Sequence, residues 1–97
     1  MTINWGLIGV GDIARKRVAN AIQLDERSQL LAACRRNPDQ LQQFCDEFSV
    51  PRAYTSASEL IADDDIQAVY LATPVKEHLL HAIAAAKAGK HVLCEKP

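Results

Sequence analysis

The sequence predicts an α/β domain built on an open, doubly wound parallel sheet. Short and nearly continuous apolar runs at residues 7–10, 30–34, 68–72 and 91–94 are typical of strands that are covered on both faces. Segments with helical spacing of apolar residues lie between these runs, and the connecting loops are short. This alternation indicates βαβ units with right-handed crossovers, and we expect the strand order 3-2-1-4-5.

Length and composition are those of one small folded domain. The chain has 97 residues, of which 48% are apolar and 24% charged. A net charge of −1 offers no basic surface, so we expect neither a nucleic acid nor a membrane as partner. The apolar runs are far shorter than the roughly 20 residues that cross a bilayer. The first residues lack the charged start and the cleavage site of a secretion signal, and we expect a cytoplasmic protein.

The cysteines and histidines do not form a metal-site pattern. Cys34, Cys45 and Cys94 are widely spaced and include no CxxC pair, so neither a zinc site nor a disulfide framework is indicated. The three histidines have no cysteine or acidic partner at ligand spacing. We therefore expect no metal and three buried, reduced thiols.

The early helices are marked by their amino-terminal ends. Residues 13–24 should form the first helix, directly after the first strand. Asn37 is a suitable N-cap for the second helix, with Pro38 at its first helical position. Residues 52–55 suggest a short edge strand. Residues 56–59 read Ser-Ala-Ser-Glu, which resembles a capping box and predicts a short third helix to about residue 62.

The last helix is predicted from its apolar stripe and its stop. A stripe that would face the sheet consists of Val75, Leu79, Ala82, Ile83 and Ala86. A glycine at position 89 follows, where a left-handed residue most easily ends a helix. The run at residues 91–94 would then be the fifth strand.

A glycine-rich run joins the first strand to the first helix. Residues 9–14 fit the pattern G-x-G-x-x-A in the strand-to-helix context that makes it informative. Gly9 permits a tight turn, Gly11 lets the backbone approach a pyrophosphate, and Ala14 allows close helix–strand packing. Backbone N–H groups at the helix start, near Asp12 and Ile13, favour an anion, with the Asp12 side chain turned outward. This predicts a Rossmann-type cofactor site, although a turn of this kind can also bind nothing.

The residues after the second strand indicate which dinucleotide binds. NAD sites usually carry an acidic residue there to hold the ribose 2′-hydroxyl. This chain has Arg35 and Arg36 instead, and the first acidic residue is Asp39. A guanidinium can pair with a 2′-phosphate and stack on adenine, so we expect NADP, with NAD as the alternative. Either arginine could instead be solvated, Arg36 more readily than Arg35.

The ends of the last two strands should complete the site. Ligands of such sheets bind beyond the carboxyl ends of the strands. The fourth strand is followed by Thr73 and Pro74, and the fifth by Glu95 and Lys96. These side chains would lie where a nicotinamide and its substrate meet.

Three motifs together carry a family resemblance along the whole chain. The G-x-G-x-x-A run, a T-P-x-x-x-H element at residues 73–78 and AGKHVLCEKP at residues 88–97 resemble the N-terminal NAD(P)-binding domain of the Gfo/Idh/MocA oxidoreductases. The resemblance implies that Lys96 is the catalytic residue, which contacts the nicotinamide ribose and polarises the substrate hydroxyl. Glu95 belongs to the same motif and would lie beside Lys96 at the cofactor. The resemblance also implies that Thr73, Pro74 and His78 lie near the nicotinamide half of the cofactor.

The resemblance has one visible exception and one implication for domain organisation. Asn usually follows the T-P pair in the family, whereas this chain has Val75. Residues 1–97 would be the dinucleotide-binding domain of a longer two-domain chain, interrupted after the fifth strand. The absent C-terminal β-sheet domain would carry the substrate pocket, the proton-transferring group and the contacts of a homo-oligomer.

Two functions remain open from the sequence. The first is an oxidoreductase that transfers hydride between NADP and a sugar, a polyol or a related hydroxyl compound, with this chain supplying the cofactor-binding half. The alternative is a non-catalytic dinucleotide-binding sensor or interaction module. The sequence identifies neither the substrate nor the direction of the reaction.

Overall fold

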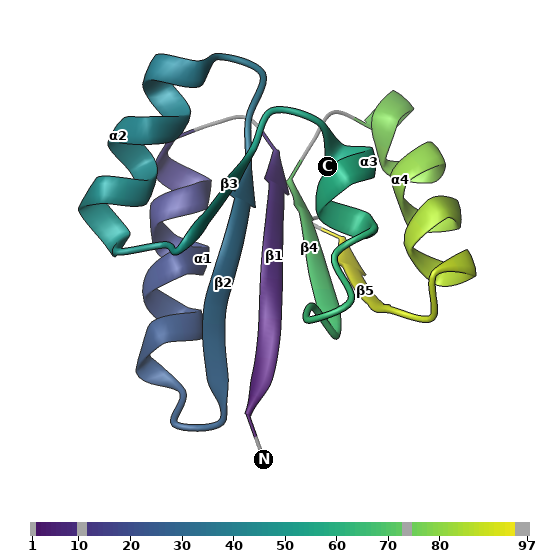
Figure 1. Cartoon of the computed structure of the whole chain (residues 1–97), viewed down its shortest axis with the longest axis horizontal. Helices are drawn as coiled ribbons and strands as arrows, with labels where there is room; N and C mark the ends of the chain where they lie inside the picture. Colours follow the sequence, from purple (N-terminus) through teal and green to yellow (C-terminus); the bar gives the residue numbers. More distant parts are fainter. Residues whose placement is uncertain (1, 10–11, 73–74, 95–97) are drawn as a thin grey trace.

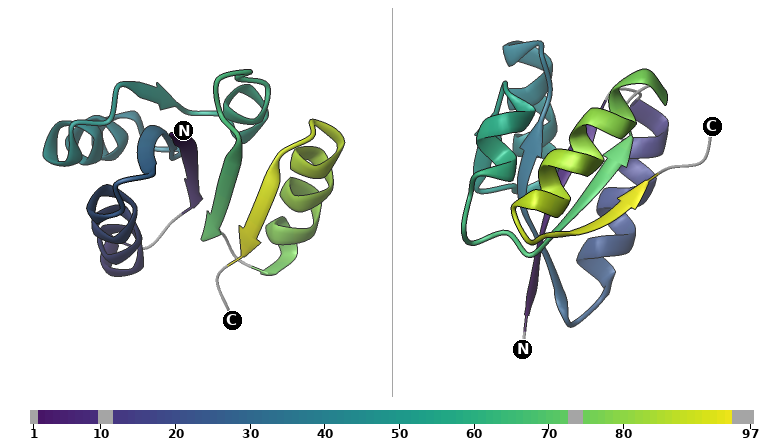
Figure 2. Two further views of the ribbon diagram at one scale, coloured as in Figure 1. Left: turned by 90° about the horizontal axis from the view of Figure 1, so that it is seen from below. Right: turned by 90° about the vertical axis from the view of Figure 1, so that its right-hand side faces the viewer.

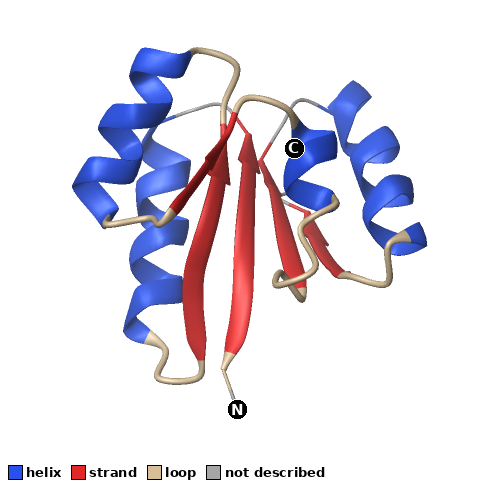
Figure 3. Cartoon of the chain, viewed as in Figure 1, coloured by secondary structure: helices blue, strands red, loops and turns tan. Residues whose placement is uncertain are grey.

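Five parallel strands form one sheet in the order β3-β2-β1-β4-β5, which confirms the predicted topology (Figures 1 and 3). The computed structural model describes residues 2–9, 12–72 and 75–94, with residues 12–15 and 75–78 described by their backbone alone. The elements are β1 (Ile3–Gly9), α1 (Asp12–Leu24), β2 (Ser28–Cys34), α2 (Pro38–Phe48), β3 (Arg52–Tyr54), α3 (Ala57–Ile61), β4 (Ala68–Ala72), α4 (Val75–Lys87) and β5 (His91–Cys94).

Helices cover both faces of the sheet and give it two cores (Figure 2). On one face, α1 and α2 pack on β1 and β2 around residues such as Leu7, Leu30 and Phe44. On the other face, α3 and α4 pack around residues such as Ile8 and Leu60. Because neighbouring residues of a strand point to opposite faces, both faces of β1 and β2 must be apolar, which explains their continuous apolar runs.

Most predicted element boundaries are confirmed. The fourth and fifth strands have the predicted bounds, and β1 begins earlier, at Ile3. Asn37 caps α2, because its Oδ1 accepts hydrogen bonds from the N–H groups of Asp39 (3.0 Å) and Gln40 (3.1 Å). The capping box of α3 is wrong: Ser56 occupies the N-cap position with extended backbone, but its side chain makes no capping hydrogen bond.

The helix α4 is rotated relative to the prediction. Leu79 and Ile83, expected to face the sheet, are 67% and 46% exposed, whereas Ala85 is fully buried. Small side chains allow the helix axis to approach the sheet closely, so alanines occupy the contact and larger side chains turn outward. The helix ends as predicted, with a φ of 79° at Gly89.

The strand β5 is more exposed than its apolar sequence suggests. It lies at the edge of the sheet, and only Val92 of its four residues is half-buried. Cys34 and Cys45 are buried as expected, but the expectation is wrong for Cys94, which is exposed. The reason is position: an edge strand has a neighbour on one side only, and the cover that continuous apolar runs predict is incomplete here.

Candidate dinucleotide-binding site

A pocket of about 330 Å³ lies at the carboxyl ends of β1 and β2. The described residues that line it are Ile8, Gly9, Cys34, Arg35, Arg36, Thr55, Ser56, Ala57, Ser58 and His81. This is the edge of a doubly wound sheet at which ligands bind, and the volume falls in the range of small-molecule sites. Three predicted site residues, Gly9, Arg35 and Arg36, are thus brought together.

The glycine at the end of β1 is required by its neighbour. Gly9 pairs with Ala72 of β4, and a Cβ at position 9 would lie 2.6 Å from the Ala72 carbonyl carbon and 2.7 Å from its Cβ. Main-chain atoms cannot move away as the tip of a flexible side chain can. A side chain here would force β1 and β4 apart at the end of the sheet that forms the site.

The two arginines lie where the sequence predicts. Arg35 follows β2 directly and is partly buried, and Arg36 is exposed. Arg35 also borders a smaller hollow between α1 and α2, which Lys16 and Gln40 help to line. No carboxylate occurs among the described residues that line the larger pocket. The set of arginines and hydroxyls suits an anionic ligand.

Some pocket residues were not recognised in the sequence. Hydroxyl side chains come from the turn between β3 and α3 (Thr55 and Ser56) and from the first turn of α3 (Ser58). His81 reaches the pocket from α4, and its Nδ1 is buried with no hydrogen-bond partner among the described residues. The available signal was a Ser/Thr-rich turn that, like the glycine run, follows a strand of the parallel sheet.

The other predicted residues are only partly covered by the structure. Asp12, Ile13 and Ala14 form the start of α1, and His78 lies in α4. Gly11, Thr73, Pro74, Glu95 and Lys96 lie outside the described residues. The neighbouring strands β4 and β5 pair in parallel through Leu71 and Cys94, so both point toward the edge that carries the pocket.

Within residues 2–9, 12–72 and 75–94, His, Cys, Asp and Glu side chains do not gather in groups of three that could hold a metal ion. None of the helices there is long and apolar enough to cross a membrane.

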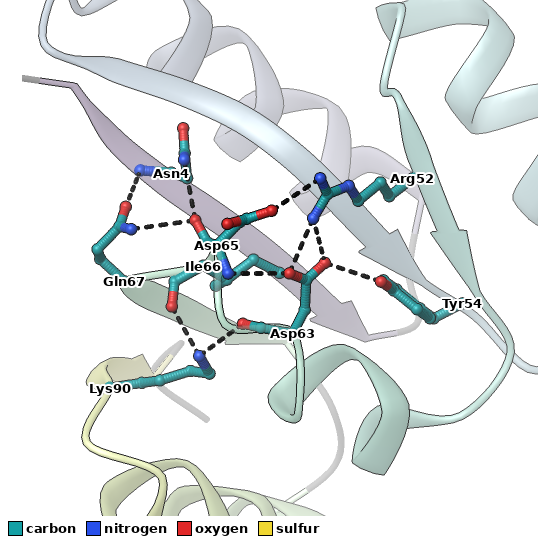
Figure 4. Close-up of polar contacts among 8 residues, drawn as sticks. All are labelled: Asn4, Arg52, Tyr54, Asp63, Asp65, Ile66, Gln67 and Lys90. Atoms are coloured by element: carbon teal, nitrogen blue, oxygen red, sulfur yellow. Dashed lines mark hydrogen bonds and ion pairs between the residues drawn. The ribbon is translucent and has the colours of Figure 1, made fainter.

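A second polar region, the Asp63 network, surrounds the loop between α3 and β4 (Figure 4). The Asp63 side chain is 7% exposed and accepts hydrogen bonds from Arg52 Nη1 (2.7 and 2.8 Å), Tyr54 Oη (2.8 Å) and the Asp65 N–H (3.0 Å). Arg52 Nη2 also donates to Asp65 (2.9 Å). Lys90, just before β5, donates to the carbonyl oxygens of Asp63 (2.8 Å) and Ile66 (2.6 Å).

These contacts shift the protonation equilibria of the network. Burial of the Asp63 carboxyl favours its neutral form, but the hydrogen bonds from Arg52, Tyr54 and the Asp65 N–H outweigh this, so the pKa of Asp63 is lowered. The hydrogen bond to Asp63, with burial adding to it, raises the pKa of Tyr54. The network thus holds the covered carboxylate of Asp63 ionised, paired with the partly exposed Arg52 guanidinium, and keeps the Tyr54 phenol neutral.

The fold and the pocket define the class of protein. A parallel sheet whose first strand ends in a closely packed glycine, with a pocket beside it at the carboxyl ends of β1 and β2, is a Rossmann-type dinucleotide-binding domain. The family model described as "Oxidoreductase family, NAD-binding Rossmann fold" matches residues 3–97. The chain belongs to this family, Gfo/Idh/MocA, as its motifs suggested.

Named relatives support the assignment. Oxidoreductase P35 of Formosa agariphila is 43% identical over 95 residues, which are 98% of this chain and 30% of that protein. A scyllo-inositol dehydrogenase of Lactobacillus casei, solved with NAD(H) and scyllo-inositol, has a TM-score of 0.90 at 30% identity, covering 100% of this chain and 28% of that one. KijD10, a 3-ketoreductase of Actinomadura kijaniata solved with TDP-benzene and NADP, has a TM-score of 0.90 at 33% identity and covers 100% and 30%. This chain therefore spans less than a third of the length of these relatives.

Proposed function

We propose that this chain is the cofactor-binding part of a longer, two-domain NADP-dependent oxidoreductase. The enzyme would transfer hydride between NADP and the hydroxyl-bearing carbon of a sugar, a polyol or a related compound. The observation that carries the cofactor assignment is the pair Arg35 and Arg36 at the pocket, in the position where an NAD site usually has an acidic residue. The relatives solved with NAD(H) and with NADP support a nicotinamide dinucleotide of either kind.

The pocket residues suit the adenosine end of NADP. Arg35 and Arg36 would pair with the 2′-phosphate, and the hydroxyls of Thr55, Ser56 and Ser58 would add hydrogen bonds around the ribose or the base. Gly9, Gly11, Asp12, Ile13 and Ala14 would bring the backbone and the start of α1 to the pyrophosphate.

The remaining site residues would act at the nicotinamide end. The nicotinamide supplies the hydride chemistry, and the protein must orient it and move a proton. We propose that Lys96 polarises the substrate hydroxyl and that Glu95, Thr73, Pro74 and His78 hold the cofactor beside it. The substrate pocket and the contacts of a homo-oligomer would lie in the second domain. The cysteines are widely spaced and suggest no disulfide framework, which supports a cytoplasmic location.

Calorimetric titration of this chain with NADPH and NADH tests the cofactor assignment. NADPH should bind at least about tenfold more tightly, because hydrogen bonds to a charged phosphate contribute about 1.5–3 kcal/mol. Arg35→Ala should weaken NADPH binding by about tenfold or more and change NADH binding much less. Arg27→Ala is the matched control, since Arg27 is an exposed arginine in the turn before β2, at the far end of that strand.

Equal affinities for the two cofactors in the unchanged chain would contradict the NADP assignment. The reaction is tested with the protein of the complete reading frame, by following NADPH oxidation with aldoses, ketoses and inosose-type ketones. Tight NADPH binding without turnover on any of them would favour a non-catalytic binding module.

A further inference from the structure

One histidine of α4 lines the pocket with a ring nitrogen that has no partner in the described part of the protein. The side chain of His81 borders the hollow of about 330 Å³ together with residues from β1, β2 and the segment that leads into α3. Its Nδ1 is buried and has no hydrogen-bond partner among the described residues. Such an atom is rare in a folded protein and destabilises it, so packing alone does not explain why a histidine occupies this position.

The two ring nitrogens of His81 have different surroundings. In a histidine, Nδ1 lies next to the point of attachment of the ring, and Nε2 lies at its far end. Since Nδ1 is covered, the ring reaches the hollow with the edge that carries Nε2. A buried N–H without a partner is less tolerable than a buried acceptor without one. The single proton of the neutral ring therefore lies on Nε2, and His81 offers a hydrogen-bond donor to the hollow.

His81 and the two arginines approach the pocket from opposite sides of β1. The helix α4 packs on β4 and β5 and lies beside α3 (Figure 1), and β1 separates β4 from β2. Arg35 and Arg36 follow β2, whereas the side that His81 reaches is shared with Ala57 and Ser58 of α3. The arginine side suits a phosphate. The helix side has a small apolar residue, a hydroxyl and an imidazole, and it suits an uncharged ring with hydrogen-bond acceptors.

The adenosine half of a dinucleotide contains such a ring. The proposed function places the pyrophosphate at Gly9 and the 2′-phosphate at the arginines, so the base is the group that remains for the side of α3 and α4. An adenine ring is uncharged, and its ring nitrogens accept hydrogen bonds. A donor at the tip of His81 therefore matches the base better than it matches a second phosphate.

We propose that His81 recognises the adenine base of the cofactor by donating a hydrogen bond from Nε2 to a ring nitrogen of the base. This rests on the proposed function, which makes the ligand a nicotinamide dinucleotide. Two tasks are then divided between the two sides of the pocket. Arg35 and Arg36 select the 2′-phosphate, which only NADP carries, whereas His81 holds the base, which NAD and NADP share. His81 thus contributes to the affinity for both cofactors and not to the choice between them.

Calorimetric titration with NADPH, NADH and adenosine 2′,5′-bisphosphate tests this division. The three ligands share the adenine base, and the bisphosphate lacks the nicotinamide half. His81→Leu should weaken the binding of all three by the same factor, about three- to tenfold, which corresponds to one neutral hydrogen bond. Arg35→Ala should instead weaken NADPH and the bisphosphate and change NADH much less.

Two amide variants distinguish the ring nitrogens. His81→Gln places an amide nitrogen near the position of Nε2 and should keep the affinities within about twofold of the unchanged chain. His81→Asn places its amide near Nδ1 and should bind as weakly as His81→Leu. The matched control is His91→Leu, at an exposed position at the start of β5, which should leave all three affinities unchanged.

Thermal melts separate a contact with the cofactor from a structural role. His81→Leu removes a buried nitrogen that has no partner, so without ligand it should melt at the same temperature as the unchanged chain or higher. A structural histidine would give a lower melting temperature together with the weaker binding.

Three results would overturn the proposal. They are unchanged affinities in His81→Leu, a loss confined to NADPH, and a loss that accompanies a lower melting temperature and is not restored by His81→Gln. Tight binding of both dinucleotides with no effect of His81→Leu refutes this inference alone. Equal affinities for NADPH and NADH, with the effect of His81→Leu intact, refute the NADP assignment alone. If the protein of the complete reading frame binds neither dinucleotide, the proposed function and this inference both fail.

Discussion

The Asp63 network and the pocket at the carboxyl ends of the strands contain similar side chains but differ in where those side chains point. In the network, Arg52, Tyr54 and Lys90 donate to protein oxygens around one loop, which fixes that loop between β3 and β5. At the pocket, Arg35 and Arg36 lie beside hydroxyl groups and a hollow of about 330 Å³. Charged side chains that are hydrogen-bonded to one another within the protein stabilise its fold. Arginines that line a pocket together with hydroxyl groups suit an anionic ligand.

The position along a strand separates the two arginine sites. Arg35 follows the carboxyl end of β2, and Arg52 is the first residue of β3. In a parallel sheet the carboxyl ends of all strands meet at one edge, and this is the edge where ligands bind. An arginine after a strand is therefore a better candidate for a ligand contact than one at its start.

The largest effect is expected from Gly9→Ala, because Gly9 packs against Ala72 of β4 and also lines the pocket. Its Cβ would meet the main chain of Ala72 at 2.6 Å, so β1 and β4 must separate. We expect a loss of about 2–3 kcal/mol in the free energy of unfolding. NADPH affinity should fall at least tenfold, measured by calorimetry at a temperature at which the variant is folded.

Gly89→Ala is the control for this glycine. Gly89 has a φ of 79° but open space around its Cα, so alanine should cost about 1 kcal/mol of stability without changing NADPH affinity. Unchanged cofactor binding by Gly9→Ala would show that the end of β1 does not form the site.

A smaller effect, confined to stability, is expected from Asp63→Ala. The change removes the acceptor of Arg52, Tyr54 and the Asp65 N–H, and we expect the free energy of unfolding to fall by about 2 kcal/mol. The melting temperature should fall by roughly 10 °C, since about 1 kcal/mol corresponds to 4–8 °C in a domain of this size.

Asp64→Ala is the matched control, because Asp64 is the exposed neighbour in the same loop. It should change stability by less than about 0.5 kcal/mol. NADPH affinity should be unchanged in both variants below their melting temperatures. A loss of affinity in Asp63→Ala would show that the two polar regions are coupled.

The contribution of Asp63 should depend on pH in a defined direction. Because its pKa is lowered in the folded protein, its carboxylate stabilises the fold above the unfolded pKa near about 4, and this is lost as the pH falls through the folded pKa. The difference in melting temperature between the unchanged chain and Asp63→Asn should therefore be constant from pH 7 to about 5 and shrink below about 4. A difference that does not shrink as the pH falls below about 4 would contradict this assignment.

The comparison also explains what the sequence could predict. The strands at residues 68–72 and 91–94 were found with their bounds because apolar runs end at polar residues there. A local motif marks Gly9 and a strand end marks the two arginines in the sequence, and the structure brings all three to one pocket. The sequence did not predict the orientation of α4, because alanine and leucine both fit an apolar stripe. Only close packing against the sheet selects the alanines for the buried side, as with Ala85.

The remaining misses share a physical cause. In the Asp63 network, Tyr54, Arg52 and Lys90 donate to oxygens of Asp63 from positions 9 to 27 residues away, and no local pattern predicts such contacts. His81 reaches the pocket only because α3 and α4 pack side by side, which depends on the crossing of the chain from β3 to β4. Local signals thus locate strand ends and caps, while contacts made by tertiary packing require the fold.

The smallest effect in the network is expected from Tyr54→Phe, which removes one hydroxyl group and keeps the ring. The phenol donates to Asp63 Oδ2 at 2.8 Å, so its loss should lower the free energy of unfolding by about 1 kcal/mol, measured by urea denaturation at pH 7. Since the pKa of Tyr54 is raised, the neutral phenol stabilises the fold below the unfolded pKa near about 10, and this is lost as the pH rises through the folded pKa. The unchanged chain should therefore lose its advantage over Tyr54→Phe in the alkaline range and also lose part of it below about pH 4, where Asp63 becomes protonated. An advantage that is the same at neutral and at strongly alkaline pH would contradict the role of the phenol.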